Sequence, residues 1–245
     1  MTAAIEAIKL RKVYKTKTAV NDIDLTVNQG ELFSLLGVNG AGKTTTIKML
    51  SCLIAPTSGD ATLLGNSIVH HPQEVKQIIN VSPQETAVAR NLSVRENLEM
   101  IAGIYGCSKI DAKAKTLEMM DQFRLNEVAE AKAKTLSGGM QRRLSIAMAL
   151  ISDPNILFLD EPTLGLDVLA RRELWNSIEK LKGKVTIILT THYMEEAEAF
   201  SDRIAVMAHG TIRAVGTVAQ LKEQTNTDNL ENAFIALASE SEADR

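Results

Sequence analysis

A phosphate-binding loop is the feature of this sequence that most restricts its fold. Residues 37–44 read GVNGAGKT, which fits G-x-x-x-x-G-K-[ST], and they follow an apolar run at residues 32–36 that predicts a strand buried on both faces. Glycines let such a loop turn backbone N–H groups toward phosphate oxygens, while Lys43 supplies positive charge and Thr44 a hydroxyl ligand for Mg²⁺. The alternative is a glycine-rich turn with a chance lysine. A G-x-G-x-x-G dinucleotide loop is disfavoured because its third glycine would fall at Thr45.

The hydrophobic pattern around this loop predicts an α/β fold. In the first 35 residues apolar and polar side chains alternate, as where Ile8 and Leu10 flank Lys9, and this alternation predicts half-buried antiparallel strands. Two later apolar runs, residues 156–159 and 185–189, predict strands buried on both faces, with helical patterns between and after them. We therefore expect a P-loop NTPase core with a mostly parallel sheet covered by helices, and an N-terminal antiparallel β subdomain.

Residues from about 86 to 153 predict an α-helical subdomain inserted into this core. Ser93 and Glu96 have the spacing of a capping box, and no strand-like run interrupts the region. Apolar side chains follow at helical intervals, at Leu98, Ile101, Ala102 and Tyr105 and then at Leu117, Met120 and Phe123. The expected organisation is one nucleotide-binding domain over residues 1–220, followed by a C-terminal helical extension and polar tail over residues 221–245. Within that tail, an apolar stripe begins at Leu230, and the final residues ESEADR are expected to fray.

Composition and charge exclude several other classes. The chain has 27 Lys and Arg against 30 Asp and Glu, a formal net charge of −3, so it lacks the positive excess of a general nucleic-acid binder. Cys52 and Cys107 lie far apart and outside any His/Cys cluster, so neither a zinc site nor a disulfide framework is expected. We see neither a secretory signal nor a membrane span, so any membrane role is expected to come through another chain.

Two acids follow the apolar run at residues 156–159. The carboxyl ends of parallel strands face the ligand crevice, so Asp160 and Glu161 are expected near the phosphate loop. Asp160 would hold Mg²⁺ directly or through water, and Glu161 would act as general base or orient the attacking water. The alternative is that these are solvated acids, which often stand at strand ends. The presence of the phosphate loop in the same chain favours the functional interpretation.

The segment LSGGMQ, residues 136–141, precedes a helical stretch at residues 142–150. Ser137 can cap that helix, and Gly138 and Gly139 leave its first N–H groups free for an anion. Taken alone, a plain helix cap after a loop is the better explanation of the segment. Its position shortly before the strand that ends in two acids makes it specific.

With these motifs, the chain resembles the ATP-binding subunits of ABC transporters from Tyr14 to about residue 220. LSGG is the signature of that family, and Met140 stands here where glutamine is commoner. The resemblance implies that Tyr14 stacks on adenine and that Gln84 links the Mg²⁺ site to the helical subdomain. It also implies that His192 contacts the γ-phosphate and that Asp167 lies in a loop crossing to a second subunit. On their own, Tyr14 would be a strand aromatic packed in a sheet, Gln84 an ordinary loop residue and His192 a surface residue.

The candidate site combines the motifs and the resemblance. The expected nucleotide-binding residues are Tyr14, Gly37, Asn39, Gly40, Ala41, Gly42, Lys43, Thr44 and Thr45. The expected catalytic residues are Glu161, His192 and Gln84, and the expected Mg²⁺ ligands are Thr44, Gln84 and Asp160. The expected signature and dimer contacts are Ser137, Gly138, Gly139 and Asp167.

The family geometry implies that two subunits sandwich two ATP molecules head to tail, with Mg²⁺ as cofactor. The expected partners are a second ATPase subunit, identical or different, and a membrane permease on a separate chain. The expected location is peripheral, on the cytoplasmic face of the cell membrane. The stretches TLGLD, THYMEEAE and LENAF are similar to ATPases of drug, antibiotic and lipid exporters, which favours export.

Two other uses of this ATPase chemistry remain as alternatives. One is a soluble ABC-type ATPase acting on ribosomes or nucleic acid, which the net charge and the lack of long coiled-coil insertions disfavour. The other is a small-molecule kinase, which the LSGG segment disfavours. No contact with nucleic acid is expected.

Overall fold

The computed structural model describes residues 2–239, so the polar end expected at residues 240–245 lies outside the described residues. The strands are β1 (Ala3–Tyr14), β2 (Lys17–Asn28), β3 (Leu32–Leu36), β4 (Ser58–Leu63), β5 (Asn66–Ser67), β6 (Ile79–Ser82), β7 (Ile156–Asp160), β8 (Thr186–Thr191), β9 (Arg203–Ala208) and β10 (Thr211–Gly216). The α-helices are α1 (Lys43–Leu50), α2 (Pro72–Ile78), α3 (Val94–Ile104), α4 (Lys109–Gln122), α5 (Gly138–Leu150), α6 (Val168–Glu179), α7 (Met194–Phe200), α8 (Val218–Thr225) and α9 (Leu230–Ser239). Two short 3₁₀ turns, Asn126–Val128 and Ala133–Thr135, lie between α4 and α5.

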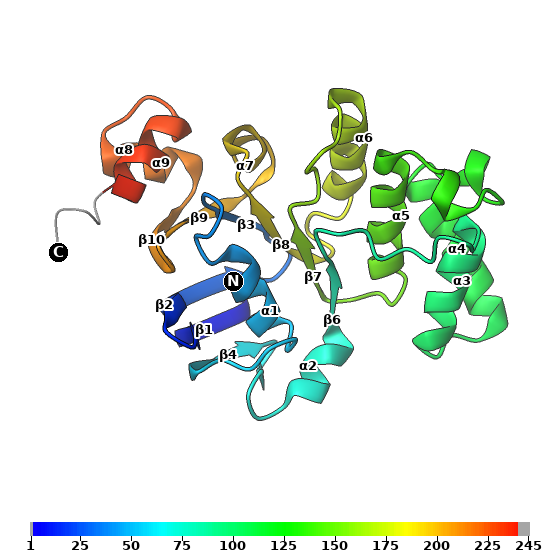
Figure 1. Cartoon of the computed structure of the whole chain (residues 1–245), viewed down its shortest axis with the longest axis horizontal. Helices are drawn as coiled ribbons and strands as arrows, with labels where there is room; N and C mark the ends of the chain where they lie inside the picture. The colour runs from blue at the N-terminus through cyan, green and yellow to red at the C-terminus, as the bar shows by residue number, and fades with distance from the viewer. Residues whose placement is uncertain (1, 240–245) are drawn as a thin grey trace.

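A six-stranded sheet forms the centre of the molecule, in the order β10-β9-β3-β8-β7-β6 (Figure 1). Its strands pair in parallel from β9 to β6, and only β10 joins antiparallel, at one edge. Every residue of β3, β7 and β8 is buried, as their continuous apolar runs predict. The predicted mostly parallel sheet is therefore confirmed. Strand β6, which was not expected from the sequence, extends this sheet at its other edge.

The N-terminal strands form a separate antiparallel sheet in the order β2-β1-β4-β5, which confirms the predicted class of this region. The simple alternation proposed for β1 is wrong at one place. Leu10 is fully buried, but Ile8 is 67% exposed. Lys9 between them has a positive φ of 49°, and the pairing register shifts between Ala7 and Leu10. This bulge turns Ile8 out of the face that alternation assigns to it.

Helices α3, α4 and α5 form a layer at one end of the molecule, between β6 and β7 in the chain (Figure 1). The capping box at the start of α3 is present: Glu96 N–H donates to Ser93 Oγ at 3.1 Å, and Ser93 N–H donates to Glu96 Oε2 at 2.7 Å. The buried side chains of Leu98, Phe123 and Leu144 join these helices to one core cluster that also contains residues of β7 and β8. Within residues 2–239, no helix combines the length and apolarity needed to cross a membrane.

Candidate functional site

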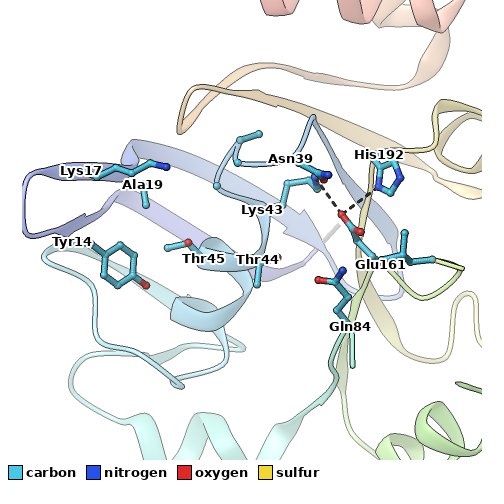
Figure 2. A pocket seen from close by; sticks show the side chains of 14 residues that line it. Tyr14, Lys17, Ala19, Asn39, Lys43, Thr44, Thr45, Gln84, Glu161 and His192 are labelled. Atoms are coloured by element: carbon cyan, nitrogen blue, oxygen red, sulfur yellow. Dashed lines mark ion pairs between the residues drawn. The ribbon is translucent and has the colours of Figure 1, made fainter. Parts of the chain in front are cut away.

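Four loops meet at the carboxyl edge of the parallel sheet, because the strands they follow run side by side in the same direction. The register pairs Leu36 at the end of β3 with Thr191 at the end of β8, and Asp160 at the end of β7 with Thr190. The neighbouring β6 ends at Ser82. The phosphate loop, Glu161 directly after β7, His192 and Gln84 are thereby brought to one place (Figure 2).

A pocket of about 520 Å³ lies at this edge. Its lining residues are Tyr14, Lys17, Ala19, Asn39, Gly40, Ala41, Gly42, Lys43, Thr44, Thr45, Gln84, Glu161, Leu164 and His192. Most of the expected nucleotide-binding and catalytic residues are among them. Three lining residues, Lys17, Ala19 and Leu164, were not expected from the sequence. Lys17 and Ala19 carry no motif and reach the pocket through the pairing of β1 with β2, and Leu164 lies in the TLGLD turn after β7.

The phosphate loop holds Lys43 in a bent, buried position. Its ammonium donates to the Gly37 carbonyl at 2.7 Å and the Val38 carbonyl at 3.2 Å, and the side chain is 5% exposed. Burial lowers the pKa of Lys43 below its ordinary value of 10.5, while the carboxylate of Glu161 acts in the opposite direction. The Lys43 side chain therefore presents its positive charge at the pocket, folded back over its own loop.

Gly42 allows the turn from this loop into α1. Its φ is 108°, and a Cβ there would lie 2.6 Å from the Ala19 carbonyl oxygen, so the position requires glycine. In the described structure no side chain caps α1 and no acid lies in its first turn. The amides at the start of α1 are therefore free for an anion at the positive end of the helix.

Glu161 lies between two basic side chains. Its Oε1 is 3.6 Å from Lys43 Nζ and 3.3 Å from His192 Nδ1, the two contacts drawn in Figure 2. The backbone of Glu161 has a φ of 45°, in the left-handed region. Its N–H donates both to the Thr190 carbonyl at 3.1 Å and to Thr190 Oγ1 at 3.0 Å, which holds this conformation. The carboxylate is thus fixed beside the phosphate loop.

Asp160 lies deeper, beside the start of α1. Its Oδ1 accepts from Thr44 Oγ1 at 3.2 Å and from Thr190 Oγ1 at 2.5 Å, and the residue is 5% exposed. Thr190 was not expected in the site, because only the pairing of β8 with β7 places it beside Asp160. Within residues 2–239 no group of three or more His, Cys, Asp or Glu side chains could hold a metal alone. The oxygens of Asp160, Thr44 and Gln84 fit a hard cation that takes its other ligands from phosphate and water.

Tyr14, the residue expected at adenine, lies at the opposite end of the pocket from Glu161 in Figure 2. The residue is 44% exposed, and Lys12 Nζ lies 5.3 Å from the centroid of its ring. A half-exposed ring at this position can stack on a planar base.

The signature residues are not part of this pocket. Ser137 Oγ caps α5 by accepting from Met140 N–H at 3.2 Å, and Asp167 Oδ1 caps α6 by accepting from Ala170 N–H at 2.9 Å. A Cβ built on Gly139 would lie 2.8 Å from the Ala170 Cβ, so the start of α5 packs closely against α6. Gly138 faces open space. The structure therefore does not bring these four residues to the phosphate loop of the same chain.

Comparisons with known proteins agree on one family. Residues 20–164 match the family model described as "ABC transporter". The chain is 40% identical over 245 residues to the daunorubicin/doxorubicin resistance ATP-binding protein DrrA of Streptomyces peucetius, covering 100% of this chain and 74% of that protein. It is 42% identical over 218 residues to the Nod factor export ATP-binding protein I of Cupriavidus pinatubonensis, covering 88% of this chain and 67% of that protein.

Solved structures give the same result. A structure described as the ATP-binding subunit of an ABC transporter superposes with a TM-score of 0.86 at 28% identity, covering 96% of this chain and 99% of that one. A dimeric ATP-binding cassette, solved in a post-hydrolysis state with ADP and Pi, superposes with a TM-score of 0.78 at 27% identity, covering 87% of this chain and 98% of that one.

Proposed function

The chain belongs to the ABC transporter family of ATP-binding proteins, and from that premise we propose that it hydrolyses ATP to drive export through a separate membrane permease. The observation that carries the proposal is the position of Glu161 Oε1, between Lys43 and His192 at the edge of a pocket lined by the phosphate loop. This geometry brings a base, a cation and a histidine to the point where a γ-phosphate on that loop would end.

Each pocket residue has a role in this proposal. The amides at the start of α1 and the ammonium of Lys43 bind the phosphates. Tyr14 stacks on the adenine. Glu161 accepts a proton from the attacking water or orients it, and His192 contacts the γ-phosphate. In the described structure Lys43 and His192 both contact Glu161, so bound phosphate would replace these contacts.

Mg²⁺ is the proposed cofactor. Thr44, Asp160 and Gln84 would hold it, and the ion would neutralise charge on the β- and γ-phosphates. Thr190 keeps the Asp160 carboxylate directed at Thr44 through a 2.5 Å hydrogen bond to the shared Oδ1 atom.

Two ATPase subunits complete the site in this proposal. Ser137, Gly138 and Gly139 lie outside the pocket of their own chain, and Gly138 is open on its outer side. A second subunit placed head to tail would bring these residues over the γ-phosphate bound by the first. An identical partner is sufficient, because one chain carries both halves of the site.

The names of relatives support export. Drug resistance and Nod factor export are the roles named for the two relatives described above, and the chain also spans 41% of a probable multidrug ABC transporter ATP-binding protein of Escherichia coli at 39% identity. We propose a peripheral location on the cytoplasmic face of the membrane, bound to the permease. The alternative, a soluble ATPase on ribosomes or nucleic acid, has no such support.

Co-purification tests the partner. The Glu161→Gln chain, held in its ATP-bound state with ATP and Mg²⁺, serves as bait in detergent-solubilised membranes, and the Lys43→Ala chain is the control that lacks bound nucleotide. We expect a stoichiometric multi-spanning membrane protein, identified by mass spectrometry, with the Glu161→Gln bait. Recovery of ribosomes or nucleic acid in its place would overturn the transport proposal and leave the ATPase chemistry standing.

Kinetics tests the base. Glu161→Gln keeps the size of the side chain and removes its basicity, so we expect hydrolysis to slow by roughly 10²–10⁴-fold. Because the phosphate loop is unchanged, ATP affinity should remain. Phosphate release and fluorescent-nucleotide titration measure the two quantities, and turnover at the wild-type rate would refute the assignment of Glu161.

A further inference from the structure

Arg142, in the second turn of α5, connects two segments of the site by hydrogen bonds. Its side chain is buried, with 4% of the residue exposed. Nη1 donates to the carbonyls of Pro83 and Gln84, the latter at 3.2 Å. Nη2 donates to the Asp160 carbonyl at 2.8 Å, and Nε donates to the Pro162 carbonyl at 2.8 Å. One guanidinium therefore binds the backbone on both sides of Glu161 and at Gln84.

These contacts need an arginine. A guanidinium directs its donors in a fixed planar fork, whereas an ammonium has three rotatable donors at one point and cannot span the same set of carbonyls. Within residues 2–239 no carboxylate forms an ion pair with Arg142; four backbone carbonyls accept its hydrogen bonds, and the nearby charge of Asp160 also favours the charged form. Burial lowers the pKa of Arg142 to about 10, which still leaves the group charged at neutral pH.

We propose that Arg142 is a positioning residue for ATP hydrolysis, which holds the Gln84 loop and the turn from Asp160 to Pro162 at one fixed separation. The inference rests on the roles proposed above for Gln84, Asp160 and Glu161. Arg142 does not line the nucleotide pocket and so acts through the residues that do. Its position on the helix that starts at the signature segment also connects that segment mechanically to the hydrolytic loops.

Arg143 provides a matched control on the same helix. It is also buried, at 7% exposure, but its Nη1 donates to the Phe123 carbonyl at 3.2 Å and lies 3.3 Å from Glu173 Oε2. These partners belong to the helical layer and to α6, away from the hydrolytic loops. A purely structural role for buried arginines in α5 predicts similar behaviour of Arg142 and Arg143.

The test compares Arg142→Lys and Arg142→Gln with Arg143→Lys and Arg143→Gln in the full chain. Thermal unfolding, ATP affinity by titration, kcat, KM and the Mg²⁺ concentration dependence are measured for each, with kcat normalised to the nucleotide-binding fraction. Misplacing reacting groups by about 1 Å costs on the order of 10²-fold in rate, so we expect kcat to fall about 10–100-fold in both Arg142 variants. Their ATP affinity should stay within about threefold, as expected when only the transition state loses stabilisation. The Mg²⁺ concentration needed for half-maximal hydrolysis should rise in both Arg142 variants.

The two Arg143 variants should lose thermal stability with kcat per binding site unchanged. An equal fall in kcat for Arg142 and Arg143 variants, or unchanged normalised kcat in both Arg142 variants, overturns the inference. Wild-type protein and Glu161→Gln run in the same assay. If Glu161→Gln hydrolyses ATP like wild type, the role proposed for Glu161 fails. If Glu161→Gln is slow and the Arg142 variants are not, only the inference about Arg142 fails.

Discussion

The two signature glycines make opposite predictions when each is replaced by alanine. Gly138 begins α5, and nothing lies within 4 Å of the position that an added Cβ would take, whereas a Cβ on Gly139 would lie 2.8 Å from the Ala170 Cβ. Ordinary carbon contacts are about 3.5–4.0 Å, so Gly139→Ala must separate α5 from α6 by about 1 Å. Overpacking of this kind costs about 1–3 kcal/mol. Replacing glycine by alanine in a helix raises the free energy of unfolding by about 0.5–1 kcal/mol, and this gain applies at either position.

These magnitudes give a measurable pair of shifts. In a chain of this size 1 kcal/mol corresponds to about 2–4 °C in Tm. Gly138→Ala should therefore melt about 1–4 °C above wild type, and Gly139→Ala up to about 10 °C below it. Circular dichroism of the nucleotide-free chain measures both. The double variant Gly139→Ala/Ala170→Gly removes this close contact. Its destabilisation should be smaller than the sum of the destabilisations measured for Gly139→Ala and Ala170→Gly separately.

Dimer formation gives the second half of this prediction. In the Glu161→Gln background with ATP and Mg²⁺, the parent chain should form a dimer in size-exclusion chromatography with light scattering. Adding Gly138→Ala should leave it monomeric although it folds more stably, because the methyl occupies the face proposed to close over the partner's nucleotide. A Gly139→Ala chain that melts at or above wild type refutes the packing argument. Full dimerisation of the Gly138→Ala chain refutes the proposed interface.

Two further predictions follow from ionisation. Burial lowers the pKa of Lys43 below 10.5 in the folded chain, and the Glu161 carboxylate opposes that shift. ATP affinity should therefore fall as pH rises through the Lys43 pKa, and in Glu161→Gln this fall should begin at a lower pH. The same pH dependence of affinity in both proteins would contradict the interaction of Lys43 with Glu161. Lys43→Ala should bind ATP weakly at every pH, which nucleotide titration checks. Burial raises the pKa of the Glu196 carboxyl above 4.5, although Thr163 Oγ1 donates a hydrogen bond to it at 2.8 Å. The folded chain therefore favours the neutral carboxyl. The stability that this group contributes is present below pH 4.5 and is lost as pH rises through its pKa in the folded chain. The Tm of Glu196→Gln should therefore gain on wild type from pH 4.5 to 7, and the opposite trend would show that the ionised form is favoured.

The sheet could be predicted where strands are buried on both faces, because short continuous apolar runs that end at glycine or at acids are typical of such strands. Strand β6 could not be predicted in this way, because it has four residues and two of them, Asn80 and Val81, are only half buried. The helical pattern was partly misleading too. Leu117 was expected in the apolar stripe of α4, but it is 54% exposed, while Thr116 is fully buried. Which face a helix buries depends on the neighbours that pack against it, and these are not visible in a local pattern.

The candidate site could be located from the sequence because parallel strands bring their carboxyl ends to one edge. Strand-end geometry located Asp160 and Glu161, whereas Gln84 and His192 were expected only from the family resemblance; these two follow β6 and β8, and both line the pocket with the phosphate loop. The contacts of Arg142 could not be predicted. Its partners are backbone carbonyls, which every residue has, and only the folded chain determines which of them converge.

At Glu161 the left-handed backbone lowers folding stability, while the side chain is needed for ATP turnover in the proposed mechanism. A non-glycine residue in this region costs roughly 1–2 kcal/mol that glycine avoids. A library of this chain selected only for heat resistance should therefore enrich glycine at position 161 and lose the carboxylate with it. Selection that includes ATP turnover should retain glutamate and find its stabilising changes elsewhere.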